Sequence, residues 1–365
     1  KPFWFKPRFT YPCSVDSLGA LPTDKMPDAT RDEQTIKRAK LWGPADEVCT
    51  LLQLEEAKKR LDGADDVLRT PLVPLTLPKS AGNGSLLLKL ENLQTCGSFK
   101  IRGMKNKLLK SGVAELKEKG MLTFSAGNAG RAVAYLGQSL GIPTKIIMPN
   151  TVPKERRALL ESMGATVEQV PSPELLDTVA ATLESEGRLL VHPFDDLDLI
   201  CGHASCGLEI LEDCSDVDAV VVCCGGGGFA AGVAAATKLS GSKARVMAVE
   251  PVGAQSMRIS FDSGEQSWCP GGKVDTICHG LAPPFAGKAT FNHCRKFVDE
   301  VVLVTDEEVK AAVRLLFEHG HVVEASGAAA VAAVLAGKCG DLAGKKVVCT
   351  VSGRNISAQD LAAFF

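Results

Sequence analysis

The chain has 365 residues, a formal net charge of −2 at pH 7, 45% hydrophobic residues and 23% charged residues. That length allows a large buried core and two or three domain-sized units. No basic block stands out and no apolar run reaches membrane-spanning length, so we expect neither nucleic acid nor a membrane among its partners.

Thirteen cysteines are scattered along the chain, several of them in apolar runs such as the one around Cys223 and Cys224. Their spacing contains no paired C-x-x-C motif, which argues against a zinc knuckle. We expect buried, reduced thiols and a cytoplasmic location.

Residues 1–43 are predicted to form an N-terminal arm ahead of the main fold. Aromatic residues such as Trp4 and Phe9 are interleaved with prolines such as Pro7. Prolines resist regular structure, whereas aromatic rings offer anchors. We expect the arm to pack on the body of the protein or on a partner subunit, and a disordered tail is the alternative.

From residue 46 onward, helical and strand-like patterns alternate. A helix is predicted at 46–61, a loop is entered at 69–72 and a turn is expected at 81–84. Strands are predicted at 85–91, 122–125, 145–148, 166–170, 189–192, 219–223, 245–249, 301–304 and 346–351. Helices are predicted at 129–140, 153–163, 174–186, 207–212, 230–239, 306–319 and 328–336. This alternation predicts an α/β fold with open, mostly parallel twisted sheets flanked by helices, whose ligand sites lie at the carboxyl ends of strands.

Two boundary signals, near residue 121 and at 193–196, divide the chain after the arm. We predict a small domain at 121–196 and a large domain made of 44–120 and 197–365.

Lys100 lies in the sequence Gly-Ser-Phe-Lys-Ile-Arg-Gly at 97–103, which leads from an apolar run into a helical pattern. A lysine forms a Schiff base well when its amine is partly desolvated at the mouth of a pocket. The aromatic face of Phe99 could stack on a planar cofactor ring. The alternative is a solvated lysine at the start of a helix.

Four consecutive glycines, Gly225, Gly226, Gly227 and Gly228, follow the strand predicted at 219–223 and open a helix. Their N–H groups can converge on an anion, which the helix N-terminus also favours, so we expect a phosphate there. The alternative is a flexible turn. The pattern differs from the dinucleotide-binding fingerprint.

Two further junctions carry polar side chains. At 125–130, backbone amides with the side chains of Ser125 and Asn128 could hold a carboxylate or a ring oxygen, and an ordinary helix cap is the alternative. At 352–355, the hydroxyl of Ser352 could bond a ring nitrogen without protonating it strongly, and a simple turn is the alternative. Together with Lys100 and the glycines, these junctions describe a pyridoxal-phosphate site.

At this point the chain resembles the serine/threonine dehydratases and serine racemases, which are pyridoxal-phosphate enzymes of fold type II. The resemblance covers roughly residues 48–358 and leaves the arm outside. It is carried by LENLQTCGSFKIRG (90–103), SAGNAG (125–130), MPNTVPKERRALLESMGATV (148–167), HPFDD (192–196), CGGGG (224–228), EASGAAA (324–330) and VSGRN (351–355).

The resemblance implies the tryptophan-synthase-β-like fold, a homodimer, and pyridoxal 5′-phosphate as cofactor. It implies a Schiff base at Lys100, ring stacking by Phe99, a ring-hydroxyl contact from Asn128, a pyridine-nitrogen contact from Ser352, and phosphate binding at 225–228. It places the carboxylate of an amino-acid substrate in the loop of Ser125, Ala126, Gly127, Asn128 and Ala129. Lys100 would then take the α-proton, the β-hydroxyl would leave, and L-serine or L-threonine would yield a 2-oxo acid and ammonia.

Ala126 departs from the racemases of the family, which carry a serine there as the acid/base on the second face of the cofactor. Alanine cannot transfer a proton, so elimination is favoured over racemisation.

Three charged or titratable residues stand at family motif positions, namely His203, His279 and Arg354. They could form a pocket for a second anion, and drift at outlying positions is the alternative. Such a pocket would suit β-replacement, in which a sulfur anion adds to the aminoacrylate, or an acidic β-hydroxy amino acid such as hydroxyaspartate.

The divalent-metal site of the family is matched only in part. Glu250 matches the family glutamate and Ala254 could offer its carbonyl, but Ser256 replaces an aspartate. A hydroxyl is a poor ligand for a hard dication.

Overall fold

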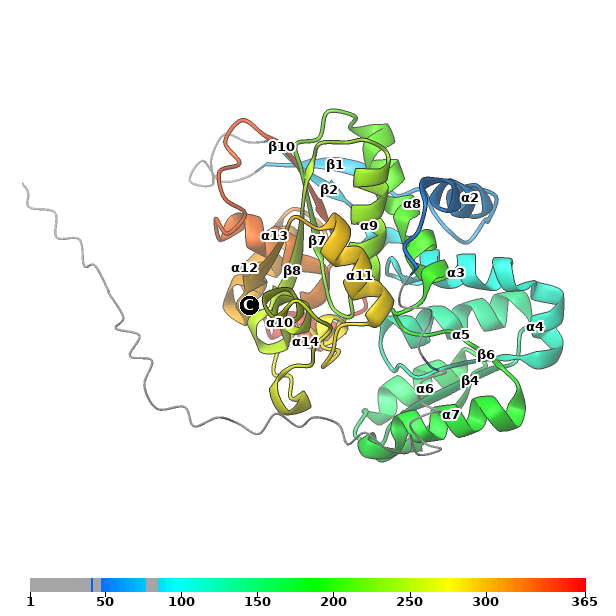
Figure 1. Ribbon diagram of the computed structural model, residues 1–365. Coiled ribbons are helices and arrows are strands. Elements are labelled where there is room, and N and C mark those ends of the chain that lie inside the picture. The colour runs from blue at the N-terminus through cyan, green and yellow to red at the C-terminus, as the bar shows by residue number, and fades with distance from the viewer. Residues whose placement is uncertain (1–40, 42–46, 77–84) are drawn as a thin grey trace, which may run out of the picture.

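The computed structural model of the chain describes residues 41, 47–76 and 85–365 (Figure 1). The predicted arm therefore lies outside the described residues except for Leu41, and so does the turn expected at 81–84. Leu41 is buried in a core with Leu122 and Ile147. Within the described ranges, no helix is long and apolar enough to span a membrane.

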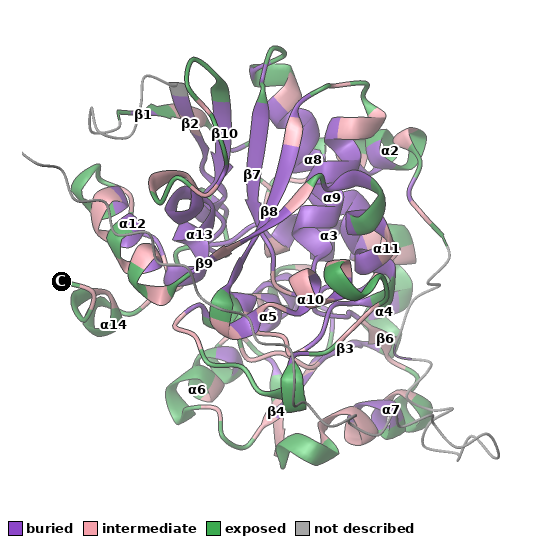
Figure 2. Cartoon of the chain, turned by 60° about the vertical axis from the view of Figure 1, so that its left-hand side comes forward, coloured by how far each residue is buried: buried purple, intermediate pink, exposed green. Residues whose placement is uncertain are grey.

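The larger sheet has six strands in the order β1-β2-β10-β7-β8-β9. Their bounds are β1 Leu72–Leu75, β2 Ser85–Lys89, β7 Ala219–Cys223, β8 Arg245–Pro251, β9 Glu300–Val304 and β10 Lys346–Thr350. Only the β1–β2 pair is antiparallel among these, and the other neighbours run parallel. The central strands are buried on both faces, which is why their sequences are nearly continuous runs of valine and alanine (Figure 2).

Helices cover both faces of this sheet (Figure 2). One layer holds α2 Leu51–Asp62, α3 Lys100–Ser111, α8 Leu197–Asp213, α9 Gly228–Leu239 and α11 Lys288–Phe297. The opposite face carries α12 Asp306–Glu318 and α13 Ala325–Leu335, and α13 packs on β7 and β8. The short helices α10 Ser256–Ser263 and α14 Ala358–Ala362 lie at the periphery.

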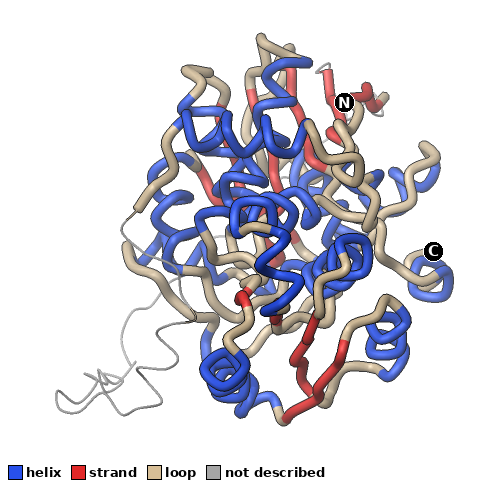
Figure 3. Tube along the Cα trace, turned by 90° about the vertical axis from the view of Figure 1, so that its right-hand side faces the viewer, coloured by secondary structure: helices blue, strands red, loops and turns tan. Residues whose placement is uncertain are grey.

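The smaller sheet has four parallel strands in the order β5-β4-β3-β6. Their bounds are β3 Met121–Thr123, β4 Thr144–Pro149, β5 Thr166–Val170 and β6 Leu189–Leu190. The helices α4 Val113–Lys119, α5 Asn128–Leu140, α6 Lys154–Ser162 and α7 Leu175–Glu186 flank it. Figure 3 shows the strands of the two sheets as separate groups, each enclosed by helices.

The predicted fold class is confirmed, since both sheets are mostly parallel and flanked by helices. The strands of the smaller sheet fall within 121–196, but α3 and α4, which precede residue 121, share a core with α5. The division at 121 therefore stays a prediction.

Several elements differ from the sequence-based expectation. The helix expected at 46–61 begins at Leu51, and α11 lies where no helix was expected. The segment entered as a loop at 69–72 continues into β1, a four-residue edge strand whose Pro74 weakens the strand signal. The helix expected at 207–212 is the seventeen-residue α8, which begins where Asp196 caps the N–H groups of Asp198 and Leu199. Its residues are buried on all sides from Leu199 to Ile210, so the sequence lacks an amphipathic period.

Candidate active site

Lys100 is the first residue of α3, and the start of that helix is fastened to the segment after β10. The N–H of Phe99 donates to the carbonyl of Ser352 (3.1 Å), and Ser98 forms a β-bridge with Gly353. The amine of Lys100 donates to the carbonyl oxygen of Pro193 (2.6 Å). Burial lowers the pKa of Lys100 to about 8, because a charged amine is poorly solvated there. The structure therefore holds this lysine partly desolvated.

The glycine run forms the loop from β7 to α9. Thr290 Oγ1 donates to the carbonyl of Gly226 (2.6 Å), and the N–H of Ala231 donates to the carbonyl of Gly227 (2.8 Å). Since a trans peptide directs its N–H opposite to its carbonyl, the N–H groups of Gly227 and Gly228 are directed away from these contacts. Gly227 has φ +95°, a conformation that favours glycine.

The loop is tight because Phe194 packs directly on it. A Cβ on Gly226 would lie 2.3 Å from the Phe194 ring, and one on Gly228 would lie 2.6 Å from the Phe194 carbonyl oxygen. Phe194 follows Pro193, whose carbonyl holds Lys100. The segment 192–196 thus joins the lysine to the glycine loop.

Asp195 and His192 hold that segment in place. The carboxylate of Asp195 accepts from the N–H groups of Lys288 and Thr290 (both 3.0 Å) at the start of α11. His192 Nδ1 accepts from the N–H of Asp195 (2.8 Å). Burial, followed by the charge of Lys100, lowers the pKa of His192 to about 3. His192 is therefore neutral beside the lysine.

Asn128 begins α5 and has both ends of its amide engaged. Its Nδ2 donates to Glu324 Oε1 (2.6 Å), and Asn355 Nδ2 donates to Asn128 Oδ1 (2.6 Å). Glu324 is the N-cap residue of α13, and burial raises the pKa of its carboxyl to about 7. A second N–H on Asn128 Nδ2 remains for a ligand in this arrangement.

Ser352 and Cys223 lie at the ends of neighbouring strands. Ser352 is buried, and its hydroxyl donates to the carbonyl of Ser326 (3.4 Å). Burial raises the pKa of Cys223 to about 11, while its contact with the Ser352 hydroxyl and the charge of Lys100 act in the opposite direction. Ser352 and Lys100 both act on the pKa of Cys223, so the three side chains lie close together.

The Phe99 ring stacks on the ring of Phe229, with centroids 4.0 Å apart and planes 18° apart. The amine of Lys100 lies 5.0 Å from the Phe99 centroid. One face of Phe99 is therefore covered by Phe229.

The loop at 125–129 joins β3 to α5, as expected. Ser125 Oγ accepts from the N–H of Gly127 (3.3 Å), and Ala126 is half-buried. A Cβ on Gly130 would lie 1.8 Å from the Ser125 carbonyl oxygen, so this turn requires glycine. Gly127 is exposed, and Ala129 is buried at the first turn of α5.

Of the three residues expected to form an anion pocket, His203 is buried, whereas His279 and Arg354 are exposed. His203 is fully buried, with its ring edge-on to Phe99 at 5.0 Å, and burial lowers its pKa far below the usual range. Burial thus disfavours a charged His203, and the second-anion pocket stays a prediction. His279 and Arg354 are exposed, and the backbone N–H of Arg354 donates to the Gly97 carbonyl.

Glu250 caps a helix. Its two carboxylate oxygens accept from the N–H groups of Met257 and Arg258 (both 2.8 Å), and burial raises its pKa to about 8. Ala254 and Ser256 are buried beside it. Across the described ranges, no group of three or more His, Cys, Asp or Glu side chains is arranged to hold a metal ion.

Sequence reasoning missed Glu324, Asn355 and Phe194 as parts of this site. Glu324 carried one usable signal, since it is a single acidic residue directly before the alanine-rich apolar run at 325–335. An acid at the start of a buried helix needs a partner, and the partner here is Asn128.

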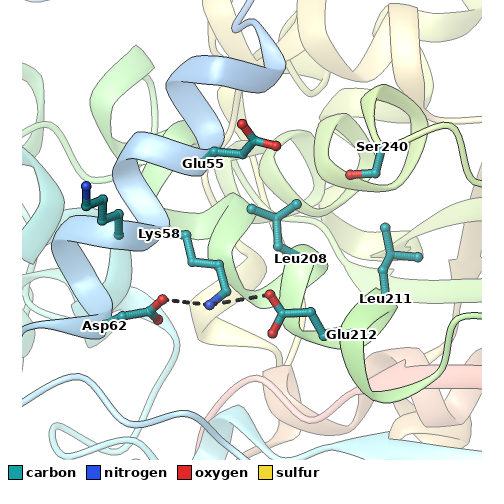
Figure 4. Close-up of a pocket in the computed structure, with 8 residues that line it drawn as sticks. Glu55, Lys58, Asp62, Leu208, Leu211, Glu212 and Ser240 are labelled. Atoms are coloured by element: carbon teal, nitrogen blue, oxygen red, sulfur yellow. Dashed lines mark hydrogen bonds and ion pairs between the residues drawn. The ribbon is translucent and has the colours of Figure 1, made fainter.

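A separate cavity of about 380 Å³ lies between α2 and α8 (Figure 4). Lys58 bridges Asp62 (2.7 Å) and Glu212 (3.5 Å) at its wall. Its lining residues include none of the predicted site residues, so we assign the chemistry to the cluster around Lys100.

Comparison with known proteins bears on this cluster. The family described as pyridoxal-phosphate dependent enzyme matches residues 64–353. An L-threonine ammonia-lyase from Thermotoga maritima is 38% identical over 313 residues, covering 85% of this chain and 76% of that relative. A catabolic L-threonine dehydratase from Escherichia coli K12 is 37% identical over 306 residues, covering 82% of this chain and 91% of the relative.

Two solved structures resemble this chain over most of its length. The structure of maize serine racemase has a TM-score of 0.80 and 30% identity, covering 87% of this chain and 97% of that one. The processed form of threonine deaminase isoform 2 from Solanum lycopersicum has a TM-score of 0.78 and 30% identity, covering 88% of this chain and 95% of that one.

Proposed function

Because the chain belongs to the pyridoxal-phosphate dependent enzymes, we propose that it is an ammonia-lyase that converts L-serine or L-threonine to a 2-oxo acid and ammonia. The observation that carries the proposal is Lys100, a desolvated lysine held 2.6 Å from the Pro193 carbonyl by the segment that also packs on the glycine loop. The names of the relatives, threonine ammonia-lyase and threonine dehydratase, support this reaction over the others of the family.

The residues present fit the cofactor. Side chains are excluded from the glycine loop by Phe194, and its N–H groups at Gly227 and Gly228 would hold the phosphate. Lys100 would hold the cofactor through its side-chain nitrogen, Asn128 would donate its second N–H to the ring oxygen, and Ser352 would meet the ring nitrogen. Phe99 would line the ring.

Pyridoxal phosphate supplies an electron sink for the α-carbon of a bound amino acid. The chain itself must orient that amino acid and move its protons. The N–H groups of the loop at 125–129 would bind the substrate carboxylate at the N-terminus of α5. The Lys100 amine, with a pKa of about 8 in this environment, would remove the α-proton when neutral.

Ala126 supports elimination rather than racemisation. Position 126, where the racemases of the family carry a serine, holds an alanine, whose methyl group cannot exchange a proton on the face opposite Lys100. The β-hydroxyl would then leave as water with the proton that Lys100 took from the α-carbon, and hydrolysis of the product would release ammonia.

The test is to incubate the purified holoenzyme with L-serine and L-threonine and to follow 2-oxo acid and ammonia. Stoichiometric formation of both products is expected, and formation of neither from either substrate would contradict the proposal. Chiral analysis reports racemisation, and added sulfite reports β-replacement through a sulfonated product. A parallel assay with a chelator reports any need for a divalent metal.

We further propose that the protein is a cytoplasmic homodimer, as the family resemblance implies. The twelve cysteines in the described ranges are all free thiols, which fits a reducing compartment. Light scattering during gel filtration gives the molar mass, and a monomer would contradict the assembly.

A further inference from the structure

Two cysteines from distant parts of the chain meet away from the site around Lys100. Cys49 precedes α2 and Cys201 lies in α8, 152 positions later, yet their sulfur atoms are 3.1 Å apart. Both residues are nearly buried, at 5% and 6% exposure. A disulfide bond is about 2.0 Å long, so a movement of about 1 Å would join the two sulfur atoms.

The surroundings make one sulfur more reactive than the other. The backbone N–H of Cys49 donates to His293 Nε2 (3.0 Å), while His293 Nδ1 pairs with the Ala289 carbonyl (2.7 Å). That carbonyl can only accept, so the ring proton resides on Nδ1 and Nε2 is the acceptor facing Cys49. The helix α11 thus presents an unprotonated imidazole nitrogen to this cysteine.

The two thiols titrate as a pair. The contact with the Cys201 sulfur, in which either thiol can be the donor, lowers the pKa of Cys49 to about 6 against the effect of burial. The same contact raises the pKa of Cys201. Thiolates rather than thiols are nucleophiles, so Cys49 is the attacking sulfur and Cys201 the resolving one.

We propose that Cys49 and Cys201 form a dithiol modification site that small hydroperoxides oxidise to a reversible disulfide. The Cys49 sulfur attacks the peroxide, whose O–O bond breaks, and the released hydroxide takes the thiol proton to leave as water. Cys201 then attacks the oxidised Cys49 sulfur, the S–S bond forms, the S–O bond breaks, and a second water leaves. Two thiols and hydrogen peroxide thus give one disulfide and two waters.

The disulfide would join the residue just before the capping box of α2 to the middle of α8. It would close a loop of about 150 residues in the unfolded chain, and such a constraint raises stability in proportion to the logarithm of loop length. We therefore expect the oxidised protein to melt at a higher temperature than the reduced protein.

The test uses the purified holoenzyme, treated with hydrogen peroxide, then denatured and alkylated without reduction. Peptide mapping by mass spectrometry is expected to show a peptide pair linked through Cys49 and Cys201, which dithiothreitol abolishes together with the rise in melting temperature. If both cysteines remain fully alkylated after peroxide, or if Cys49 pairs with another cysteine, the proposal is wrong.

Two variants of α8 sharpen the test. Cys201→Ala removes the resolving sulfur, so no linked pair and no melting shift are expected, and dimedone should label Cys49 as sulfenic acid. Cys206→Ala removes another buried cysteine of α8 and should behave like the unmodified sequence. A peroxide-dependent rise in melting temperature that persists in Cys201→Ala would contradict the proposal. If a variant fails to fold, the peptide map of the unmodified protein still tests the proposal.

Discussion

The burial of Lys100 lowers the stability of the folded chain at neutral pH, because its amine is charged there. Its pKa is about 8 in the folded chain and about 10.5 in an unfolded one, so between these values the unfolded state binds more protons. Stability therefore increases as pH rises from 8 to 10.5, and the full cost of burying the charge is present below pH 8. The same desolvation makes the amine available as a base near neutral pH.

Replacing Lys100 by methionine should stabilise the cofactor-free protein. We expect Lys100→Met to gain about 1 to 3 kcal/mol at pH 7 and to lose much of that gain at pH 10, because the buried charge is gone. Urea unfolding at both pH values measures this. Lys107→Met on the same helix is the control, since Asp196 and Asp198 raise the pKa of Lys107 and its loss should destabilise the protein. Equal gains at pH 7 and pH 10 would contradict the account.

Glu324 fixes the orientation of the Asn128 amide. Because the pKa of Glu324 is about 7, its carboxylate accepts fully from Asn128 only above that pH. We therefore expect the affinity for the cofactor to rise as the pH increases through 7. Absorbance titration of the cofactor-free protein with pyridoxal phosphate measures this affinity.

Two substitutions separate charge from hydrogen bonding at this position. Glu324→Gln keeps an acceptor but cannot titrate, so the pH dependence of cofactor affinity should flatten. Glu324→Ala leaves Asn128 without its acceptor and should weaken affinity about tenfold. A step near pH 7 that survives in Glu324→Gln would assign the titration to another group.

At the scale of elements, the β7–α9 loop depends on the absence of side chains. We expect Gly226→Ala to weaken cofactor binding at least tenfold, because its Cβ would lie 2.3 Å from the Phe194 ring. Fluorescence titration with pyridoxal phosphate measures the loss. Gly63→Ala is the control, since the nearest heavy atom to its Cβ lies 3.9 Å away. Adding Phe194→Ala to Gly226→Ala should recover part of the affinity, and no recovery would show that the clash is not the cause.

The helix α3 also carries Arg102, the centre of a buried network of ion pairs two residues after Lys100. Arg102 is fully buried and bonds Glu91 (2.7 and 2.8 Å) and Glu209 (2.7 and 2.8 Å), while Lys89 also bonds Glu209 (2.7 Å). Two cations thus balance two carboxylates, and all four side chains are buried. The network fixes α3 between the larger sheet and α8, and so fixes the position of Lys100.

Arg102→Met should lower the free energy of unfolding by about 3 to 5 kcal/mol, because it removes the cation that balances buried Glu91 and leaves Glu209 with Lys89 alone from this network. Denaturant unfolding of the holoenzyme measures this change. Arg157→Met, which removes a surface pair with Glu161 at 2.9 Å, should cost less than about 0.5 kcal/mol. Comparable losses in the two variants would mean that the buried network contributes little.

At the scale of the whole molecule, the sequence predicts what lies at strand ends. The junctions at Gly225 and Ser352 follow neighbouring parallel strands of the larger sheet, whose carboxyl ends lie at one edge, whereas Ser125 follows β3 of the smaller sheet. Lys100 joins them through the bridge between Ser98 and Gly353. Most of the fold could therefore be predicted from local patterns, whereas the roles of the site residues stay predictions.

Contacts between distant residues could not be predicted in this way. The Asn128–Glu324 bond joins residues 196 positions apart, and no local pattern encodes it. The burial of His203 between α3 and α9 likewise depends on how tightly α8 packs, which its sequence does not show. Its position at a family motif suggested a charged pocket, whereas burial lowers its pKa and so disfavours the charged form.

The central claim is that the cofactor is held by Lys100. Reducing the holoenzyme with borohydride and mapping its peptides by mass spectrometry tests this directly, because the reduced cofactor stays attached to the lysine that bound it. We predict a single phosphopyridoxyl group on Lys100 and none in a Lys100→Ala variant. A label on Lys105, Lys107 or another lysine, or no label despite bound cofactor, would contradict the account.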